Sequence, residues 1–224
     1  MTDRKHRGIS WLIGLAAPAL FLVVAKILPN LRTGTDGEVV LRDAVLMFAC
    51  LVAVGLLGRA GPLPPVSMGL QRPRFRTLWL GLVGGIATIL VSVAASAAAA
   101  RLGMHQNAAM MAIFATRPPW LLLLVALTAG VSEEIVFRAV MIPSLSAASG
   151  SLAFGAFVSL AAFAAAHVTG WGWQQILFAA VPGLVLTGLF VWSRDLGACI
   201  LAHFLTDAVG LLSAVAAAHG GVHP

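Results

Sequence analysis

The sequence predicts an all-α polytopic membrane protein with about seven (six to eight) transmembrane helices around a polar intramembrane cavity. Composition is the first observation: 60% of the 224 residues are hydrophobic and only 10% are charged, which is typical of integral membrane proteins rather than soluble domains. The second is that apolar segments of roughly 20 residues, enough to cross a bilayer as a helix, recur along the chain. The third is that the few ionisable residues inside these segments share helix faces in short patterns.

The apolar segments give the expected elements in order. The first apolar run favours a retained helix over a signal peptide, whose apolar core is usually about half as long. A loop at 29–43 precedes the second span, and the proline-rich loop at 59–76 is expected to be ordered only around 66–70. We expect membrane helices over residues 9–28, 44–57 (or from 39), 78–100, 120–148, 152–168, 176–192 with a break at Pro182-Gly183, and 196–217, a short interfacial helix within 101–119, and a free tail from His219.

Basic residues predict the topology. The net charge of +6 does not indicate nucleic-acid binding, because the basic residues fall at the ends of apolar spans. The N-terminus, residues 1–8, is basic, and the loop 59–76 holds four arginines and no acid, so both are expected to face the cytoplasm. We therefore expect a single integral membrane domain over 1–224, multi-pass in the plasma membrane. Abundant alanine and the absence of tyrosine indicate a bacterial source.

Three charges lie inside the fourth apolar span: Glu133, Glu134 and Arg138. A charge near the centre of a membrane helix costs at least about 2.5 kcal/mol on insertion scales, so such residues mark a functional site by default. Glu134 and Arg138 are four residues apart and share a helix face, which predicts an ion pair. Glu133 points elsewhere and is left to face a polar cavity as a general base. The alternative is a buried ion cluster with a purely structural role.

Two more polar pairs lie in later apolar spans, each with four-residue spacing. The fifth span contains Phe163 and His167, and the seventh contains His203 and Asp207. Residues four apart lie on one helix face, so each pair points in one direction. Hydrocarbon cannot satisfy these groups, and we therefore expect Glu133, His167 and His203 to converge on one wet cavity.

At this point the sequence resembles a known family. Glu-Glu-x-x-x-Arg at 133–138, Phe-x-x-x-His at 163–167 and His-x-x-x-Asp at 203–207 are similar to the three signature motifs of the CAAX protease and bacteriocin-processing family (CPBP, also called Abi). These are intramembrane proteases related to the type II CAAX prenyl endopeptidase. The resemblance extends from the fourth to the seventh span and implies that residues 120–217 form the catalytic core of a membrane-embedded peptidase, a hydrolase.

The resemblance also implies a role for each motif residue. Glu133 and His167 would activate a water that attacks a peptide carbonyl. His203 and Asp207 would stabilise the oxyanion; an ionised aspartate would repel that charge, so Asp207 is expected either to be protonated or to orient His203 by accepting its proton. The supporting residues would be Glu134, Arg138 and Phe163.

The sequence leaves several alternatives open. Glu133, His167 and His203 are all acceptable zinc ligands, but no His-Glu-x-x-His spacing is present, so catalysis without a metal or with a transiently bound Zn²⁺ is favoured. A non-catalytic bacteriocin-immunity or scaffold protein is a second class. A proton-coupled transporter is disfavoured because no internal repeat is visible. The expected partners are the lipid bilayer and a peptide or protein substrate at the membrane, with a C-terminal or prenylated site among the options, and no nucleic acid.

Overall fold

The computed structural model describes residues 2–28, 30, 32–60 and 63–220, with residues 2–5, 60 and 218–220 described by their backbone alone. Within these residues, seven helices are long and apolar enough to cross a membrane, one of them the 31-residue span Pro119–Ser149. This confirms the predicted all-α polytopic architecture. The elements in order are α1 (Thr2–Ile27), α2 (Asp36–Ala60), α3 (Phe75–Arg101), α4 (Ala108–Ala115), α5 (Pro119–Glu133), the π-helix η1 (Glu134–Met141), α6 (Ile142–Ser149), α7 (Leu152–Trp171), α8 (Gln175–Ser193) and α9 (Leu196–Gly220).

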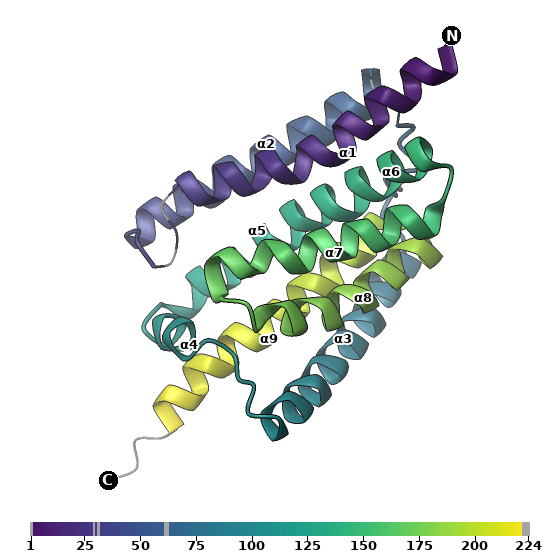
Figure 1. Cartoon of the computed structure of the whole chain (residues 1–224). Helices are drawn as coiled ribbons and strands as arrows, with labels where there is room; N and C mark the ends of the chain where they lie inside the picture. Colours follow the sequence, from purple (N-terminus) through teal and green to yellow (C-terminus); the bar gives the residue numbers. More distant parts are fainter. Residues whose placement is uncertain (1, 29, 31, 61–62, 221–224) are drawn as a thin grey trace.

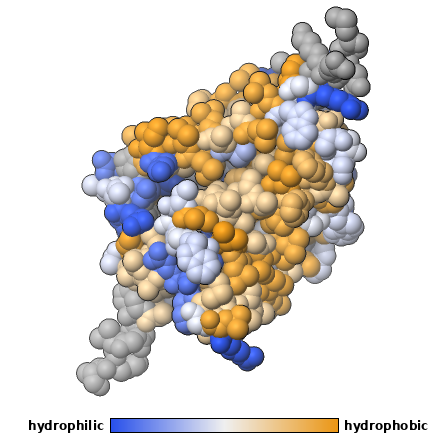
Figure 2. Space-filling view, viewed as in Figure 1, coloured by the Kyte–Doolittle hydropathy of each residue, from blue (hydrophilic) through white to orange (hydrophobic). Residues whose placement is uncertain are grey.

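The continuous rod formed by α5, η1 and α6 runs through the middle of the molecule (Figure 1). Helices α1 and α2 pack along one side of it, α1 against η1 and α6, and α2 against α5 and η1. On the other side lie α7 and α9, with α8 behind α7 and α3 against α8 and α9. Figure 2 shows hydrophobic side chains over the middle of one face and hydrophilic ones gathered towards its two ends. That distribution fits a protein with its long axes across a bilayer.

The structure differs from the expected boundaries at three places. Helix α8 is continuous through Pro182, because neighbouring helices support a proline in a membrane helix and can satisfy the groups it frees. The second span, expected from 44 or from 39, begins at Asp36, so Asp43 lies inside α2 and is 1% exposed. The backbone of α9 is helical to Gly220, so the free tail expected from His219 does not begin there, and residues 221–224 lie outside the described part of the chain.

Two glycines bring the central helices close together. A Cβ added at Gly130 of α5 would lie 3.2 Å from both the Ile200 carbonyl oxygen and the Phe204 amide nitrogen of α9. A Cβ at Gly183 of α8 would lie 2.9 Å from the ring of Phe163 in α7. Small residues allow membrane helices to approach this closely. The acidic segment after Gly130 is therefore held directly beside α9.

The acidic motif passes from α5 into the π-helix η1, whose eight residues are all buried. Pro143 follows two residues later; it has no N–H for the carbonyl of Ala139, and its ring crowds that carbonyl. The helix therefore widens to i→i+5 hydrogen bonding in the turns just before this proline. The hydroxyl of Ser159 in α7 donates a hydrogen bond of 2.6 Å to the carbonyl of Phe137 within η1, which ties the π-helix to α7.

We expect Ser159→Ala to lower the free energy of unfolding by about 1–3 kcal/mol, because it removes a buried donor to the Phe137 carbonyl. Ser213→Ala is the matched control: Ser213 is exposed and bonds only within its own helix, to the Gly210 carbonyl. Thermal unfolding of both variants in the same detergent measures the difference. Equal stability of the two variants would contradict a role for Ser159 in holding η1.

Candidate active site

Glu134 is the centre of the buried polar cluster. Its side chain is fully buried, and Oε1 accepts a hydrogen bond of 2.8 Å from Arg138 Nη1, which is the predicted contact. Oε1 also lies 2.9 Å from Nδ1 of His203 in α9. The sequence did not predict this second contact, because it joins helices 69 residues apart in the chain. Glu134 therefore links η1 to α9 as well as to its own helix.

Arg138 is held on three sides. Besides the pair with Glu134, its Nη2 donates a hydrogen bond of 3.2 Å to the Gly183 carbonyl of α8. Its guanidinium carbon also lies 4.3 Å from the ring centroid of Phe163 in α7, within the range of a cation–π contact. Arg138 is 1% exposed. One guanidinium thus connects η1, α7 and α8.

His203 is flanked by carboxylates on both ring nitrogens. Nδ1 faces Glu134 at 2.9 Å, and Nε2 lies 3.4 Å from Oδ2 of Asp207. An ionised carboxylate only accepts hydrogen bonds, so a His203 that bonds two ionised carboxylates would donate from both nitrogens, as an imidazolium does. The Asp207 side chain is 36% exposed, whereas Glu134 is fully buried. The Nε2–H is therefore the donor that could exchange its contact with Asp207 for a hydrogen bond to a ligand.

Glu133 and His167 form a second pair. Nε2 of His167 lies 4.0 Å from Oε2 of Glu133, slightly beyond a direct hydrogen bond. Nδ1 of His167 lies 2.8 Å from the carbonyl oxygen of Phe163. A carbonyl can only accept, so Nδ1 carries the proton, and in a neutral imidazole Nε2 is then an acceptor. Glu133 Oε2 is buried and has no hydrogen-bond partner. Two acceptors thus face one another across a gap that suits a water donating a hydrogen to each.

Phe163 separates these two pairs. Its ring centroid lies 4.8 Å from that of His167 and 6.0 Å from that of His203. The three residues expected to converge lie in one cluster but are paired separately: Glu133 faces His167, and His203 faces Glu134. Adjacent helical residues point in different directions, so one meets α7 and the other meets α9. The three motifs therefore form one polar cluster with two distinct halves.

The proposed zinc ligands do not form a ligand set. Among the described residues there is no group of three or more His, Cys, Asp or Glu side chains placed to hold a metal ion. Glu133 and His167 lie in one half of the cluster and His203 in the other. The residues as arranged do not fit the three-ligand site of a catalytic zinc.

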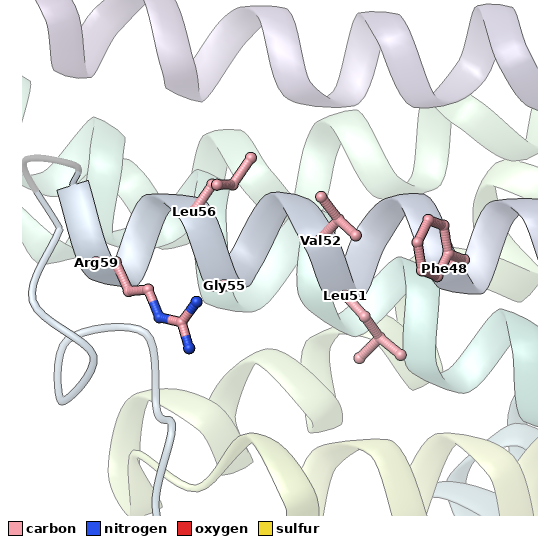
Figure 3. A pocket seen from close by; sticks show the side chains of 6 residues that line it. All are labelled: Phe48, Leu51, Val52, Gly55, Leu56 and Arg59. Atoms are coloured by element: carbon pink, nitrogen blue, oxygen red, sulfur yellow. The ribbon is translucent and has the colours of Figure 1, made fainter.

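Two surface hollows are present among the described residues, and neither is lined by residues of the cluster. A groove of about 450 Å³ lies on the outer face of α2, opposite the buried Cys50 and Val54, and Figure 3 shows its lining of Phe48, Leu51, Val52, Gly55, Leu56 and Arg59. A more polar pocket of about 410 Å³ is lined by Gly103, His105, Gln106, Asn107, Ala108, Trp171, Gly172, Trp173, Gln174 and Gln175. Trp171 of this pocket is one helical turn beyond His167. The polar pocket is therefore the nearer to the cluster along the chain.

Helix α4 packs against α9 beside that pocket. Phe114 of α4 is 2% exposed and its ring centroid lies 5.3 Å from that of Trp171. Asn107 caps α4 with its side-chain oxygen and donates a hydrogen bond of 3.0 Å to the Trp171 carbonyl. The interfacial helix predicted between 101 and 119 is thus present and is tied to the end of α7.

Comparison with known proteins gives one family. Residues 115–209 match the family model described as Rce1-like, type II CAAX prenyl endopeptidase Rce1-like. The match runs from the last residue of α4 into α9 and includes every residue of the polar cluster, although it covers somewhat less than half of the chain. No curated protein and no solved structure matches the chain. The family resemblance inferred from the three motifs is confirmed.

Proposed function

We propose that this multi-pass membrane protein, whose residues 115–209 match the Rce1-like family of type II CAAX prenyl endopeptidases, is an intramembrane endopeptidase whose nucleophile is a water between Glu133 and His167. The observation that carries the proposal is the pair of opposed acceptors, Glu133 Oε2 and His167 Nε2, 4.0 Å apart. A water there donates one hydrogen to each acceptor and turns a lone pair towards a substrate carbonyl. Hydrogen bonds in substrate-free sites are often long and shorten when substrate binds.

The chemistry then follows from the roles of these groups. As the water oxygen attacks the peptide carbonyl carbon, Glu133 takes its proton as general base, and the carbonyl oxygen becomes an oxyanion. The Nε2–H of His203 then donates a hydrogen bond to that oxyanion. While no substrate is bound, the same N–H donates to the Asp207 carboxylate instead. Collapse of the tetrahedral intermediate breaks the C–N bond, and the proton held by Glu133 passes to the leaving amine. The products are a carboxylate and a free amine.

Glu134, Arg138 and Phe163 support this reaction without touching the substrate. Glu134 orients His203 through Nδ1, and Arg138 neutralises Glu134 and is stacked on Phe163. Charges in a membrane interior persist only when they are paired. These contacts hold the His203 ring in place while the hydrogen bond of its Nε2–H changes acceptor from Asp207 to the oxyanion.

The substrate proposed is a membrane-associated peptide or protein. The family description supports a substrate cut near its C-terminus, and a prenyl group is one of the anchors to be tested. The polar pocket at Asn107 and Trp171 suits entry of the peptide beside His167. The arginine distribution supports a cytoplasmic N-terminus in a bacterial plasma membrane as part of the same proposal.

The test is cleavage of membrane peptides by the purified protein in lipid vesicles, with products identified by mass spectrometry. The panel includes peptides with and without a prenylated C-terminal cysteine. We expect the parent protein to cleave and His167→Gln to lose about 10²–10⁴-fold in rate. The control is His6→Gln, because His6 is exposed in the first turns of α1 and lines neither hollow. Absence of parental cleavage across the panel would leave the non-catalytic immunity or scaffold role in place of the peptidase.

The dependence of cleavage on a metal ion is tested with a chelator. If Glu133 and His167 activate the water without a metal, treatment with a chelator leaves the cleavage rate nearly unchanged. An essential zinc would instead make chelation abolish cleavage and added zinc restore it. Metal analysis of the active protein before and after chelation gives a second readout. Stoichiometric zinc whose removal stops cleavage would contradict the metal-free mechanism.

A further inference from the structure

A second buried carboxylate lies in the membrane spans, outside the family motifs. Asp43 of α2 is 1% exposed, and its Oδ1 accepts a hydrogen bond of 3.1 Å from Arg42 Nη1. Its other oxygen, Oδ2, is buried and has no hydrogen-bond partner, and neither has Nε of Arg42. The proposed reaction does not use Asp43. A buried carboxylate in a membrane helix marks a functional position by default.

The face of α5 opposite Asp43 is also polar. The Thr128 hydroxyl is placed for a long hydrogen bond to the Asp43 carboxylate, but its buried Oγ1 makes none with the distance and angle of a normal hydrogen bond. One turn further along α5, the Ser132 hydroxyl donates a bond of 2.6 Å to the Thr128 carbonyl. Cys50, two turns after Asp43 on α2, has its Sγ 4.0 Å from the Ser132 carbonyl oxygen. Polar groups therefore follow the α2–α5 interface up to Glu133.

The unpartnered atoms at this interface include both donors and acceptors. Arg42 Nε donates, Asp43 Oδ2 accepts and Thr128 Oγ1 can do both. Glu133 Oε2, which also has no partner, follows Ser132 on α5 and faces His167 of α7. Nearly all buried polar atoms in folded proteins have a partner, and ordered water supplies it where the protein does not. A buried water typically makes about three hydrogen bonds to such groups. Arg42, Asp43 and Thr128 offer that number of groups, and Thr128 precedes the proposed base by five residues on α5.

We propose that ordered water occupies the α2–α5 interface from Asp43 to Glu133 and replenishes the water that hydrolysis consumes. The supply role rests on the proposed function, whereas the presence of water at the interface does not. Each turnover removes one water from the gap between Glu133 and His167, and a neighbouring water moves in to replace it. Thr128 is a positioning residue in this scheme, since it contacts the water and not the substrate.

The two native cysteines provide a matched probe of water at the interface. Both are buried in hydrophobic clusters, and each Sγ lies 4.0 Å from a carbonyl oxygen, that of Ser132 for Cys50 and that of Leu186 for Cys199. Only Cys50 lies at the α2–α5 interface, so the two thiols differ in position and not in burial. Exchange of the thiol hydrogen for deuterium is followed by infrared spectroscopy, with Cys199→Ala isolating Cys50 and Cys50→Ala isolating Cys199. A dry buried group exchanges only when the structure opens, so we expect Cys50 to exchange at least about tenfold faster than Cys199.

Thr128→Val removes the hydroxyl with little change in shape and should slow exchange at Cys50. The same substitution at Thr88 is the control, because Thr88 is buried in α3 and bonds the Gly84 carbonyl of its own helix. In the cleavage assay, we expect Thr128→Val to lower kcat with KM nearly unchanged, and Thr88→Val to leave both at the parent values. Unfolding temperatures of both variants show that the fold is retained.

The outcomes separate the two proposals. Equally slow exchange at both cysteines, or exchange at Cys50 that Thr128→Val leaves unchanged, overturns the water site whether or not the protein cleaves peptides. Fast exchange at Cys50 with an unchanged kcat for Thr128→Val overturns the supply role. Fast, Thr128-dependent exchange in a protein that cleaves nothing supports the water site and overturns the supply role together with the proposed function.

Discussion

Glu133→Gln is expected to lower the rate of peptide cleavage by about 10²–10⁴-fold while leaving the protein folded. Glutamine has the size of glutamate and can still bind water, but its amide cannot take the proton of the attacking water. The Glu133 side chain is 19% exposed, and its Oε2 has no hydrogen-bond partner. The substitution therefore breaks no direct contact of that oxygen. Cleavage is measured with purified protein in vesicles and normalised to folded protein.

The neighbouring carboxylate provides the control for that experiment. Glu134→Gln exchanges an anion for a neutral amide between Arg138 and His203, at 2.8 and 2.9 Å. The carboxylate that lies between Arg138 and His203 then no longer neutralises their positive charges. We therefore expect loss of folded protein before any specific loss of chemistry. If Glu133→Gln cleaves as fast as the parent, Glu133 is not the base. If both variants lose folded protein alike, the acidic pair is structural.

Arg138→Ala is expected to lower the free energy of unfolding by about 3–5 kcal/mol, because it breaks a buried ion pair and leaves a carboxylate in the membrane interior. The substitution removes the 2.8 Å bond to Glu134, the 3.2 Å bond to the Gly183 carbonyl and the contact with the Phe163 ring. Helices α7 and α8 lose a common attachment to η1. The expected readouts are a lower yield of membrane-inserted protein and a lower unfolding temperature in detergent.

Two further variants isolate the cause. Arg138→Lys keeps the charge but cannot reproduce the fork that bonds Glu134 and Gly183 together, so we expect only partial recovery of stability. Arg101→Ala is the neutral control, because Arg101 is exposed at the end of α3. Unfolding of Arg138→Ala at the same temperature as Arg101→Ala would show that the guanidinium does not hold the cluster together.

The membrane architecture could be predicted from the sequence because it depends on local properties. Hydrocarbon requires helices of a certain length, and apolar segments of that length are visible along the chain. The pairing of Glu134 with Arg138 could also be predicted, since four-residue spacing within one helix determines which side chains meet. The three motifs also resemble those of a peptidase family, and the match over residues 115–209 supports that resemblance.

Contacts between helices could not be predicted in this way. That His203 meets Glu134 and His167 meets Glu133 depends on how α9 and α7 pack around the acidic segment, and on the close approach that Gly130 and Gly183 allow. The sequence left Asp43 either in the loop or in the second span, and packing of α2 against α5 buries it beside Thr128. The physical reason is that periodicity determines the direction of a side chain around its own helix, whereas the partner it meets depends on the rotation, tilt and depth of another helix.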